Sequence, residues 1–407
     1  MSMLDQLSQA DCWERFYTYK ESLACTQQFT AALREFIDRE EYRAVCEAIA
    51  RGDRFPIPRK AVISKMHSLK KRTVYTYPDT ENTVLKLLTY LLLRRYDGLF
   101  SGNLFSFRPN RTAKDALRFL THTNGISEMY SYKADISNYF NSIPVERLLS
   151  MLRDATADDP KLYAFLESLL CEPQVIDKNR IVTEEKGIMA GTPLSSFYAN
   201  LYLKDLDRWF WERRIPYARY SDDMILFAPT KEECEAYAQK VRDVLGESGL
   251  RLNPEKESFS EPHRMWSFLG FSFCGGTVDI APVSAAKIKD KMHRKARALA
   301  RWRDRNHLSG EKAATAFIRI FNRKLMESGA DHELTWSYWF FPVITTAESL
   351  RMIDLYAQDC IRFLVSGTRT KARFNVRYAD IKRLGYRSLV HEYYAHRKAE
   401  AEEQSSE

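Results

Sequence analysis

Apolar residues recur at three- and four-residue spacing through the N-terminal part of the chain, which is the period of an amphipathic helix. The segments CWERFYTYKESLA and TAALREFIDREEYRAVCEAIA carry this pattern, and the prolines Pro56 and Pro58 end it. We therefore expect an N-terminal helical region over residues 1–55. The most apolar run, Val84 to Leu93, is too short to cross a bilayer and predicts a buried helix.

Between Ala61 and about Thr277 the pattern changes to a mixture of helices and short strands. The segments that are typical of strands are YSYKADI, ARYSDDMILFA and SFLGFSF. Beyond Pro282 the chain becomes helical again and strongly basic. This order predicts an α+β body that is flanked by helical sections.

The composition is that of a globular protein too large for one ordinary core, with 407 residues of which 45% are hydrophobic and 29% charged. Lys plus Arg exceeds Asp plus Glu by 62 to 54, and the net charge of +8 weakly favours a polyanionic partner. The N-terminus has no secretory pattern, and the seven cysteines have no metal-ligand spacing. These features predict a reduced, cytoplasmic protein with no membrane segment.

Acidic residues interrupt two of the predicted strands. Asp135 ends the stretch Met129 to Ile136, while Asp222 and Asp223 stand between Tyr220 and the apolar run MILFA. Adjacent like charges repel and burial adds to the cost, so we expect a hairpin in which ARY enters, SDD turns and MILF returns. A polar turn is the plain interpretation. The alternative is that the carboxylates converge on two divalent cations, an arrangement that supports in-line phosphoryl transfer.

Several motifs in a fixed order give the chain a resemblance to a known family. They are SFRPNRTAKDAL (106–117), DISNYF (135–140), GIMAGTPLSSFYANLYL (187–203), YSDD (220–223), GLRLNPEKES (249–258) and SFLGF (267–271). In this order they resemble the reverse transcriptase family, in the prokaryotic branch that includes group II intron and retron enzymes. The resemblance implies a right-hand polymerase: fingers and palm over residues 56–277 with an antiparallel palm sheet, and an α-helical thumb and C-terminal extension over residues 278–407.

The resemblance also implies a role for each acidic residue. Asp135, Asp222 and Asp223 would be the catalytic carboxylates and would hold two Mg²⁺ ions, for which Mn²⁺ could substitute. The carbonyl of Ile136 would be a further metal ligand. Lys256 matches the basic residue that protonates the leaving pyrophosphate.

Residues for the incoming nucleotide follow from the same motifs. Phe140 falls at the steric gate, where its ring would exclude a ribose 2′-hydroxyl; the plain alternative is a core residue. Lys65 and Arg72 match the finger residues that grip the triphosphate, with Lys71 as the alternative to Arg72. Gly191 belongs to the same pocket. The family often has Gln where this chain has Ala190, and Ala or Met where it has Ser221. Neither departure removes a metal ligand, and the missing Gln side chain affects the template or nucleotide contacts expected near Gly191.

Primer and template contacts are implied at Arg108, at Pro193 and at the primer grip of Phe268, Leu269 and Gly270. The next segment, Ala285 to Asn306, carries basic residues at three- and four-residue steps, so a helix there would bear a positive stripe. Its members are Lys287, Lys291, Arg294, Arg297, Arg301 and Arg305. The stripe suits a thumb that follows nucleic-acid phosphates, and the plain alternative is a solvated surface helix.

The resemblance thus implies an RNA-directed DNA polymerase, a nucleotidyltransferase that uses an RNA template, a DNA primer and dNTPs. By elimination the chain is most like the free-standing bacterial enzymes of antiphage defence or unknown group, whose partner is often a non-coding RNA. The alternatives are a template-independent or protein-primed terminal transferase, a group II intron or retron enzyme, and a non-catalytic RNA-binding scaffold. A homo-oligomer or a partner protein stays open.

Overall fold

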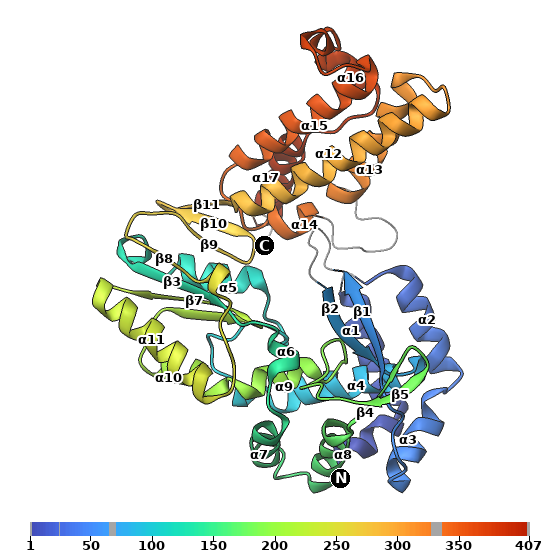
Figure 1. Cartoon of the computed structure of the whole chain (residues 1–407), viewed down its shortest axis with the longest axis vertical. Helices are drawn as coiled ribbons and strands as arrows, with labels where there is room; N and C mark the ends of the chain where they lie inside the picture. The colour runs from blue at the N-terminus through green and yellow to red at the C-terminus, as the bar shows by residue number, and fades with distance from the viewer. Residues whose placement is uncertain (1, 24, 65–70, 327–335, 405–407) are drawn as a thin grey trace. The chain divides into compact units, whose positions relative to one another are not determined.

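The computed structural model describes residues 2–23, 25–64, 71–326 and 336–404. The chain forms two compact units, the first of residues 1–23 and 29–263 and the second of residues 24–28 and 264–407 (Figure 1). The α+β class predicted from the sequence is confirmed, because sheets with antiparallel pairing combine with helices and the C-terminal region is mainly helical. No helix in the described ranges is both long enough and apolar enough to cross a membrane.

The N-terminal helices pack around buried aromatic rings. Trp13 is fully buried, stacks on Tyr42 with ring centroids 4.7 Å apart, and donates its indole N–H to the Leu7 carbonyl at 2.7 Å. Helices form where the sequence predicts them, and apart from residues 24–28 they belong to the first unit. Its elements are η1 (Met3–Ser8), α1 (Ala10–Ser22), α2 (Gln27–Asp38) and α3 (Tyr42–Arg51).

A four-stranded sheet, here called the finger sheet, has the order β2-β1-β4-β5. Its strands are β1 (Arg59–Ser64), β2 (Lys71–Thr76), β4 (Gln174–Asp177) and β5 (Arg180–Thr183). The predicted buried helix lies inside α4 (Asp79–Arg95), where Val84, Leu88 and Leu92 are fully buried. That prediction is therefore confirmed.

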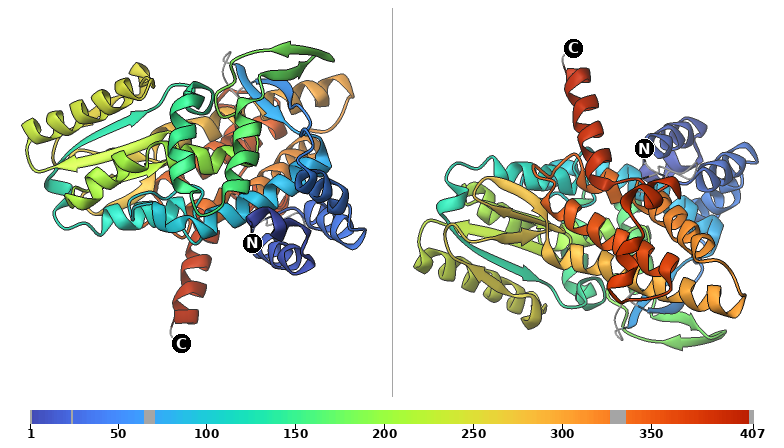
Figure 2. Two further views of the ribbon diagram at one scale, coloured as in Figure 1. Left: turned by 90° about the horizontal axis from the view of Figure 1, so that it is seen from below. Right: turned by 90° about the horizontal axis from the view of Figure 1, so that it is seen from above.

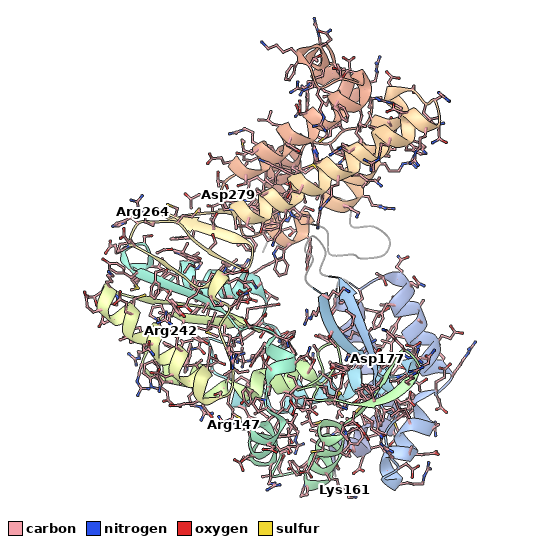
Figure 3. All side chains as sticks on the ribbon, in the orientation of Figure 1. Arg147, Lys161, Asp177, Arg242, Arg264 and Asp279 are labelled. Carbon is pink, nitrogen blue, oxygen red and sulfur yellow. The ribbon has the colours of Figure 1, made fainter. Side chains whose placement is uncertain are left out.

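A second four-stranded sheet, here called the palm sheet, has the order β6-β7-β3-β8. Its strands are β3 (Tyr130–Asp135), β6 (Tyr217–Tyr220), β7 (Asp223–Ala228) and β8 (Ser258–Ser260). Helix α11 (Lys231–Glu247) packs on β3 and β7 and carries Arg242, which is labelled in Figure 3. Arg242 pairs with Glu257 and lies over the Tyr132 ring at 5.4 Å. Because β7 is covered, its apolar run MILFA is buried throughout.

Shorter helices connect these sheets. They are η2 (Asp97–Leu99), α5 (Ala113–Thr121), η3 (Ile126–Glu128), α6 (Tyr139–Ser142), α7 (Val145–Ala155), α8 (Pro160–Cys171), α9 (Ser195–Tyr202), α10 (Lys204–Glu212) and η4 (Pro254–Lys256). Side-chain caps stabilise the N-terminal ends of α5 and of α11. Thr112 and Asp115 form a reciprocal capping box at α5, and Thr230 accepts a hydrogen bond from the Glu233 N–H at the start of α11.

The second unit combines a three-stranded sheet with helices. The strands β9 (Trp266–Phe268), β10 (Phe271–Cys274) and β11 (Thr277–Ile280) pair in the order β11-β10-β9. Helices α12, α13 and α15 lie side by side (Figures 1 and 2). The helices of this unit are α12 (Pro282–Arg305), α13 (Gly310–Leu325), α14 (Trp336–Phe340), α15 (Glu348–Ser366), η5 (Lys371–Asn375), α16 (Tyr378–Arg383) and α17 (Leu389–Gln404).

Two details differ from the sequence-based expectations. The segment SFLGFSF is a hairpin and not one strand, because Leu269 (φ 52°) and Gly270 (φ 91°) both adopt the left-handed conformation of a tight turn. The C-terminal part of the second unit begins at Arg264, whereas the thumb expected from the sequence begins at residue 278. The strands β9 to β11 belong to this unit because β11 packs on α15 and Val278 donates its N–H to the Thr345 hydroxyl at 2.9 Å.

Candidate active site

The hairpin that joins β6 to β7 carries two of the predicted carboxylates. Tyr220 pairs with Asp223, so the turn consists of Ser221 and Asp222, and Asp223 is the first residue of β7. Ser221 has a φ of 62°, a left-handed conformation that residues with a side chain rarely adopt. The predicted hairpin is therefore confirmed, with Asp223 in the strand and not in the turn.

The third carboxylate lies opposite this hairpin. Strand β3 is antiparallel to β7, and Asp135 pairs directly with Asp223. Side chains that face each other in this way have Cβ atoms about 4.5–5.5 Å apart on one face of the sheet. The N–H of Ile136 donates to the Asp222 carbonyl at 3.1 Å, which ties the end of β3 to the turn. The structure thus brings together the three acidic residues that the sequence singled out.

The carboxyl groups of Asp222 and Asp223 are partly shielded from solvent. Burial raises the pKa of Asp222, and the nearby Asp135 raises it further. Burial also raises the pKa of Asp223 to about 6, with Lys133 opposing and Asp222 and Asp135 adding to the shift. Such shifts mark acidic groups that repel one another and would be stabilised by added positive charge.

Lys256 supplies part of that positive charge. It lies on η4, and its ammonium donates to Asp135 Oδ2 at 2.6 Å. Burial opposes its charge, but this hydrogen bond and the fields of the three carboxylates together raise the pKa of Lys256. The predicted general acid is therefore protonated at neutral pH and adjacent to the three carboxylates.

The donor chemistry of this cluster suits hard divalent cations, because carboxylate and peptide oxygens are the ligands that Mg²⁺ prefers. In the part of the chain that the structure describes, no three carboxylate, imidazole or thiol side chains form a metal-binding group by themselves. With Lys256 paired to Asp135, the protein offers an incomplete ligand set. Phosphate oxygens of a bound nucleotide would complete such a set.

A buried ion pair between Arg219 and Asp207, which the sequence does not predict, supports the hairpin between β6 and β7. The Arg219 guanidinium donates to both carboxylate oxygens of Asp207, at 2.8 and 2.5 Å, and both side chains are 0% exposed. Arg219 also donates to the Ser221 carbonyl at 3.2 Å. A charged residue in the otherwise apolar strand segment YARY is the signal that could have revealed it, because a buried Arg requires a partner.

Ser106 supports the other side of the same turn. Its hydroxyl accepts a hydrogen bond from the Ser221 N–H at 2.8 Å and donates to Asn200 at 3.2 Å. The amide of Asn200 returns a hydrogen bond to the Ser106 carbonyl at 2.8 Å. Both peptide polar groups of Ser221 are thus held by buried partners, which explains how the left-handed turn residue is maintained.

Arg108, which the sequence places in a primer or template contact, is buried against Asp97 in the structure, and its predicted contact stays a prediction. Its side chain is 5% exposed and makes a two-pronged ion pair with Asp97 at 2.7 and 2.9 Å. It also donates to the Ser101 carbonyl at 2.6 Å. These contacts favour a structural role for Arg108, while Ser106 of the same motif bonds directly to the turn that carries Asp222.

Phe140 is half-buried, and the chain around it is closely packed. Its ring meets Phe107 edge-on, with centroids 6.4 Å apart and an interplanar angle of 81°. Its carbonyl accepts the Ile188 N–H at 2.9 Å. A Cβ on Gly187 would lie 2.6 Å from that carbonyl oxygen, so only glycine permits this approach.

The finger strand β2 contacts the loop of residues 187–191, which also contains Gly187. A Cβ on Gly191, whose φ is 102°, would lie 3.2 Å from Val74 Cβ, and the Tyr75 N–H donates to the Ala190 carbonyl at 2.8 Å. Arg72 is exposed and shares the face of Val74, because side chains alternate along a strand. Lys71 shares the other face with Tyr75. Lys65, the other predicted triphosphate ligand, lies outside the described residues.

Pro193 is half-buried in the loop before α9. The remaining predicted contacts lie in the second unit. Phe268 is fully buried and precedes the turn of Leu269 and Gly270. The predicted basic helix is confirmed as α12, and the stripe residues that it exposes are Lys287, Lys291, Arg294, Arg297, Arg301 and Arg305.

Comparison with known proteins decides the family. The model of the family "Reverse transcriptase (RNA-dependent DNA polymerase)" matches residues 63–273, more than half of the chain. The chain belongs to the reverse transcriptase family. The match covers the finger strand β2, the palm sheet and the three carboxylates, so the family assignment and the geometry concern the same residues.

This reverse transcriptase is similar to proteins encoded in introns. It is 22% identical over 240 residues to the group II intron-encoded protein LtrA of Lactococcus lactis subsp. cremoris, which covers 58% of the chain and 39% of that protein. It is 26% identical over 152 residues to an uncharacterized 91 kDa protein in the cob intron of Schizosaccharomyces pombe, covering 37% and 18%. The chain therefore spans well under half the length of these relatives.

Among solved structures, the reverse transcriptase is similar to apo telomerase from Candida tropicalis, with a TM-score of 0.48 and 12% identity over 84% of this chain and 62% of that one. A form of that telomerase truncated from its C-terminal domain gives a TM-score of 0.44 and 13% identity, covering 56% and 55%.

Replacing Asp223 by Asn should stabilise the metal-free reverse transcriptase near neutral pH. An unfolded Asp has a pKa of about 3.9, and the folded value is about 6. Ionisation of Asp223 therefore lowers the free energy of unfolding above about pH 6. Below about pH 4 the carboxyl is protonated in both the folded and the unfolded state, and this destabilisation disappears. Melting temperatures in EDTA should rise for Asp223→Asn at about pH 7.5 and converge with wild type toward about pH 4. Asp243→Asn, an exposed carboxyl on α11, is the control; an equal gain there would contradict the account.

Replacing Arg219 by Ala should destabilise the protein strongly, because Asp207 would be left buried without its partner. Breaking a buried ion pair typically costs about 3–5 kcal/mol. Urea denaturation measures the loss, and the exposed Arg208→Ala on α10 should change stability by less than about 0.5 kcal/mol. Similar losses in the two variants would show that the buried pair has no special role.

Proposed function

We propose that this protein copies an RNA template into DNA, adding deoxynucleotides to the 3′-hydroxyl of a DNA primer. The observation that carries the proposal is the cross-strand pair of Asp135 and Asp223 with Asp222 beside it, on the sheet matched by the family model. A polar turn alone needs no third carboxylate opposite it. The pKa shifts of Asp222 and Asp223 support a cluster that binds cations.

Two Mg²⁺ ions, or Mn²⁺, would be held by Asp135, Asp222, Asp223 and the Ile136 carbonyl, and would stabilise the attacking and leaving oxygens of phosphoryl transfer. The protein's own groups divide the remaining work. Arg72, on the face of β2 that meets Gly191, would bind the triphosphate as a fixed positive charge. Lys256, protonated and within 2.6 Å of Asp135, would donate a proton to the departing pyrophosphate.

Phe140 would select the sugar. Its backbone is fixed by the Ile188 N–H and by the close approach of Gly187, while its ring is only half-buried. A rigidly placed ring can reject a 2′-hydroxyl, because the extra oxygen has no space and no hydrogen-bond partner. This explains why an aromatic residue near a polar site is not fully part of the core.

We further propose that the exposed basic stripe of α12 binds the phosphates of the primer–template duplex, with Pro193 and the turn of Phe268, Leu269 and Gly270 as further contacts. For the biological role we propose a cytoplasmic enzyme of antiphage defence that copies a non-coding RNA. This part rests on the resemblance to free-standing bacterial reverse transcriptases, and a homo-oligomer or partner protein is compatible with it.

The combined substitution Asp222→Ala and Asp223→Ala should abolish Mg²⁺-dependent nucleotide incorporation, because two of the three carboxylate ligands are lost. RNA binding, measured by fluorescence anisotropy, should persist. Asp243→Ala should leave both activities unchanged. Unchanged DNA synthesis by the double variant would refute the metal assignment and with it the proposed chemistry.

Replacing Phe140 by Ala should relax sugar selection. Removing the ring creates space for a 2′-hydroxyl, so the ratio of kcat/KM for a dNTP to that for the matching rNTP should fall by about tenfold or more. Single-nucleotide primer extension measures both values. Phe374→Ala, which removes an exposed ring from η5, should not change the ratio. A core role for Phe140 would instead lower both rates equally.

A further inference from the structure

The side chain of Asn141 joins two segments that are distant in the sequence. Its Nδ2 donates to the Thr73 carbonyl on β2 at 3.2 Å, across 68 residues. Its Oδ1 accepts the Ala190 N–H at 3.1 Å, across 49 residues. A primary amide offers both a donor and an acceptor, so Asn141 acts here as one additional peptide group between a strand and a loop.

These contacts belong to a closed ring of hydrogen bonds. Asn141 bonds to Thr73 and to the Ala190 N–H, and the Ala190 carbonyl accepts the Tyr75 N–H at 2.8 Å. Ala190 is 1% exposed and has only a methyl group, so it cannot supply this polar bridge itself. Three segments are thereby held at fixed spacing: β2, α6 and the loop of residues 187–191.

Three of the four residues of the ring are direct neighbours of residues that the proposed function assigns to the incoming nucleotide, and the fourth, Tyr75, lies farther along β2. Thr73 follows Arg72, Asn141 follows Phe140, and Ala190 precedes Gly191. We propose that Asn141 is a positioning residue for nucleotide selection, whose amide sets the distance between the triphosphate ligand on β2 and the ring that excludes the 2′-hydroxyl. This inference rests on the proposed function and names a determinant of its specificity.

A merely structural role for Asn141 predicts a different result. If the amide only stabilises the fold, its loss lowers the melting temperature, or reduces kcat equally for deoxy- and ribonucleotides. If it positions the nucleotide site, its loss changes KM for the dNTP more than kcat, and the two sugars are affected unequally. The ratio of the two kcat/KM values therefore separates the interpretations.

The experiment measures kcat and KM for one dNTP and the matching rNTP on the same primer–template. Asn141→Ala removes both hydrogen bonds, so it should raise KM for the dNTP and lower the dNTP/rNTP ratio by about fivefold or more, since about fivefold corresponds to a single lost hydrogen bond. Asn141→Asp keeps the acceptor for Ala190 but loses the donor to Thr73, and should give an intermediate ratio. Gln239→Ala, which removes an exposed amide from α11, should match wild type.

An unchanged ratio in an active Asn141→Ala enzyme would overturn this inference while leaving the proposed function intact. Wild-type protein without templated dNTP incorporation would instead overturn the proposed function. If Asn141→Ala fails to fold, Asn141→Asp provides the same comparison, since it retains one of the two hydrogen bonds. In that variant an unchanged ratio would again overturn the inference.

Discussion

The antiparallel pairing of β3 with β7 sets Asp135 directly opposite Asp223, and it does so at a cost. Two carboxylates on one face of a covered sheet repel each other, and Asp222 adds a third negative charge at the turn. Lys256 offsets part of this repulsion by its hydrogen bond to Asp135. The remaining excess of negative charge makes the cluster suited to cations. The same repulsion that destabilises the fold would therefore favour the binding of metal ions.

The surrounding structure resists that repulsion. A hairpin with a left-handed Ser221 would relax if its peptide groups were free, but Arg219 and Ser106 bind its carbonyl and its N–H. Arg219 is in turn fixed by Asp207 in a fully buried ion pair. The same principle applies to the nucleotide side, where Gly187 and the amide of Asn141 hold backbone segments that carry the proposed ligands. Rigid support at both places is what preorganised catalysis requires.

Much of the site could be predicted from local sequence. The carboxylates were visible because they interrupt apolar strand patterns, and the basic stripe of α12 was visible because its spacing is helical. The hydrogen-bond partners of these residues cannot be predicted from local sequence, because they come together only in the tertiary structure. Lys256 and Asp135, for example, are 121 residues apart. The motif around Arg108 predicts a nucleic-acid contact, but the ion pair that buries its guanidinium against Asp97 cannot be seen in the sequence. For Arg219 the sequence shows an unusual charge but not that Asp207 satisfies it.

The central claim is templated synthesis of DNA on RNA, and the most direct test is to sequence the products made on RNA templates of defined, differing sequence. The purified protein is supplied with an annealed DNA primer, all four dNTPs and Mg²⁺. The account predicts DNA products complementary to each template, and none when the divalent cation is removed. Products of the same sequence whichever template is supplied, or made equally without one, would contradict it and indicate terminal transfer.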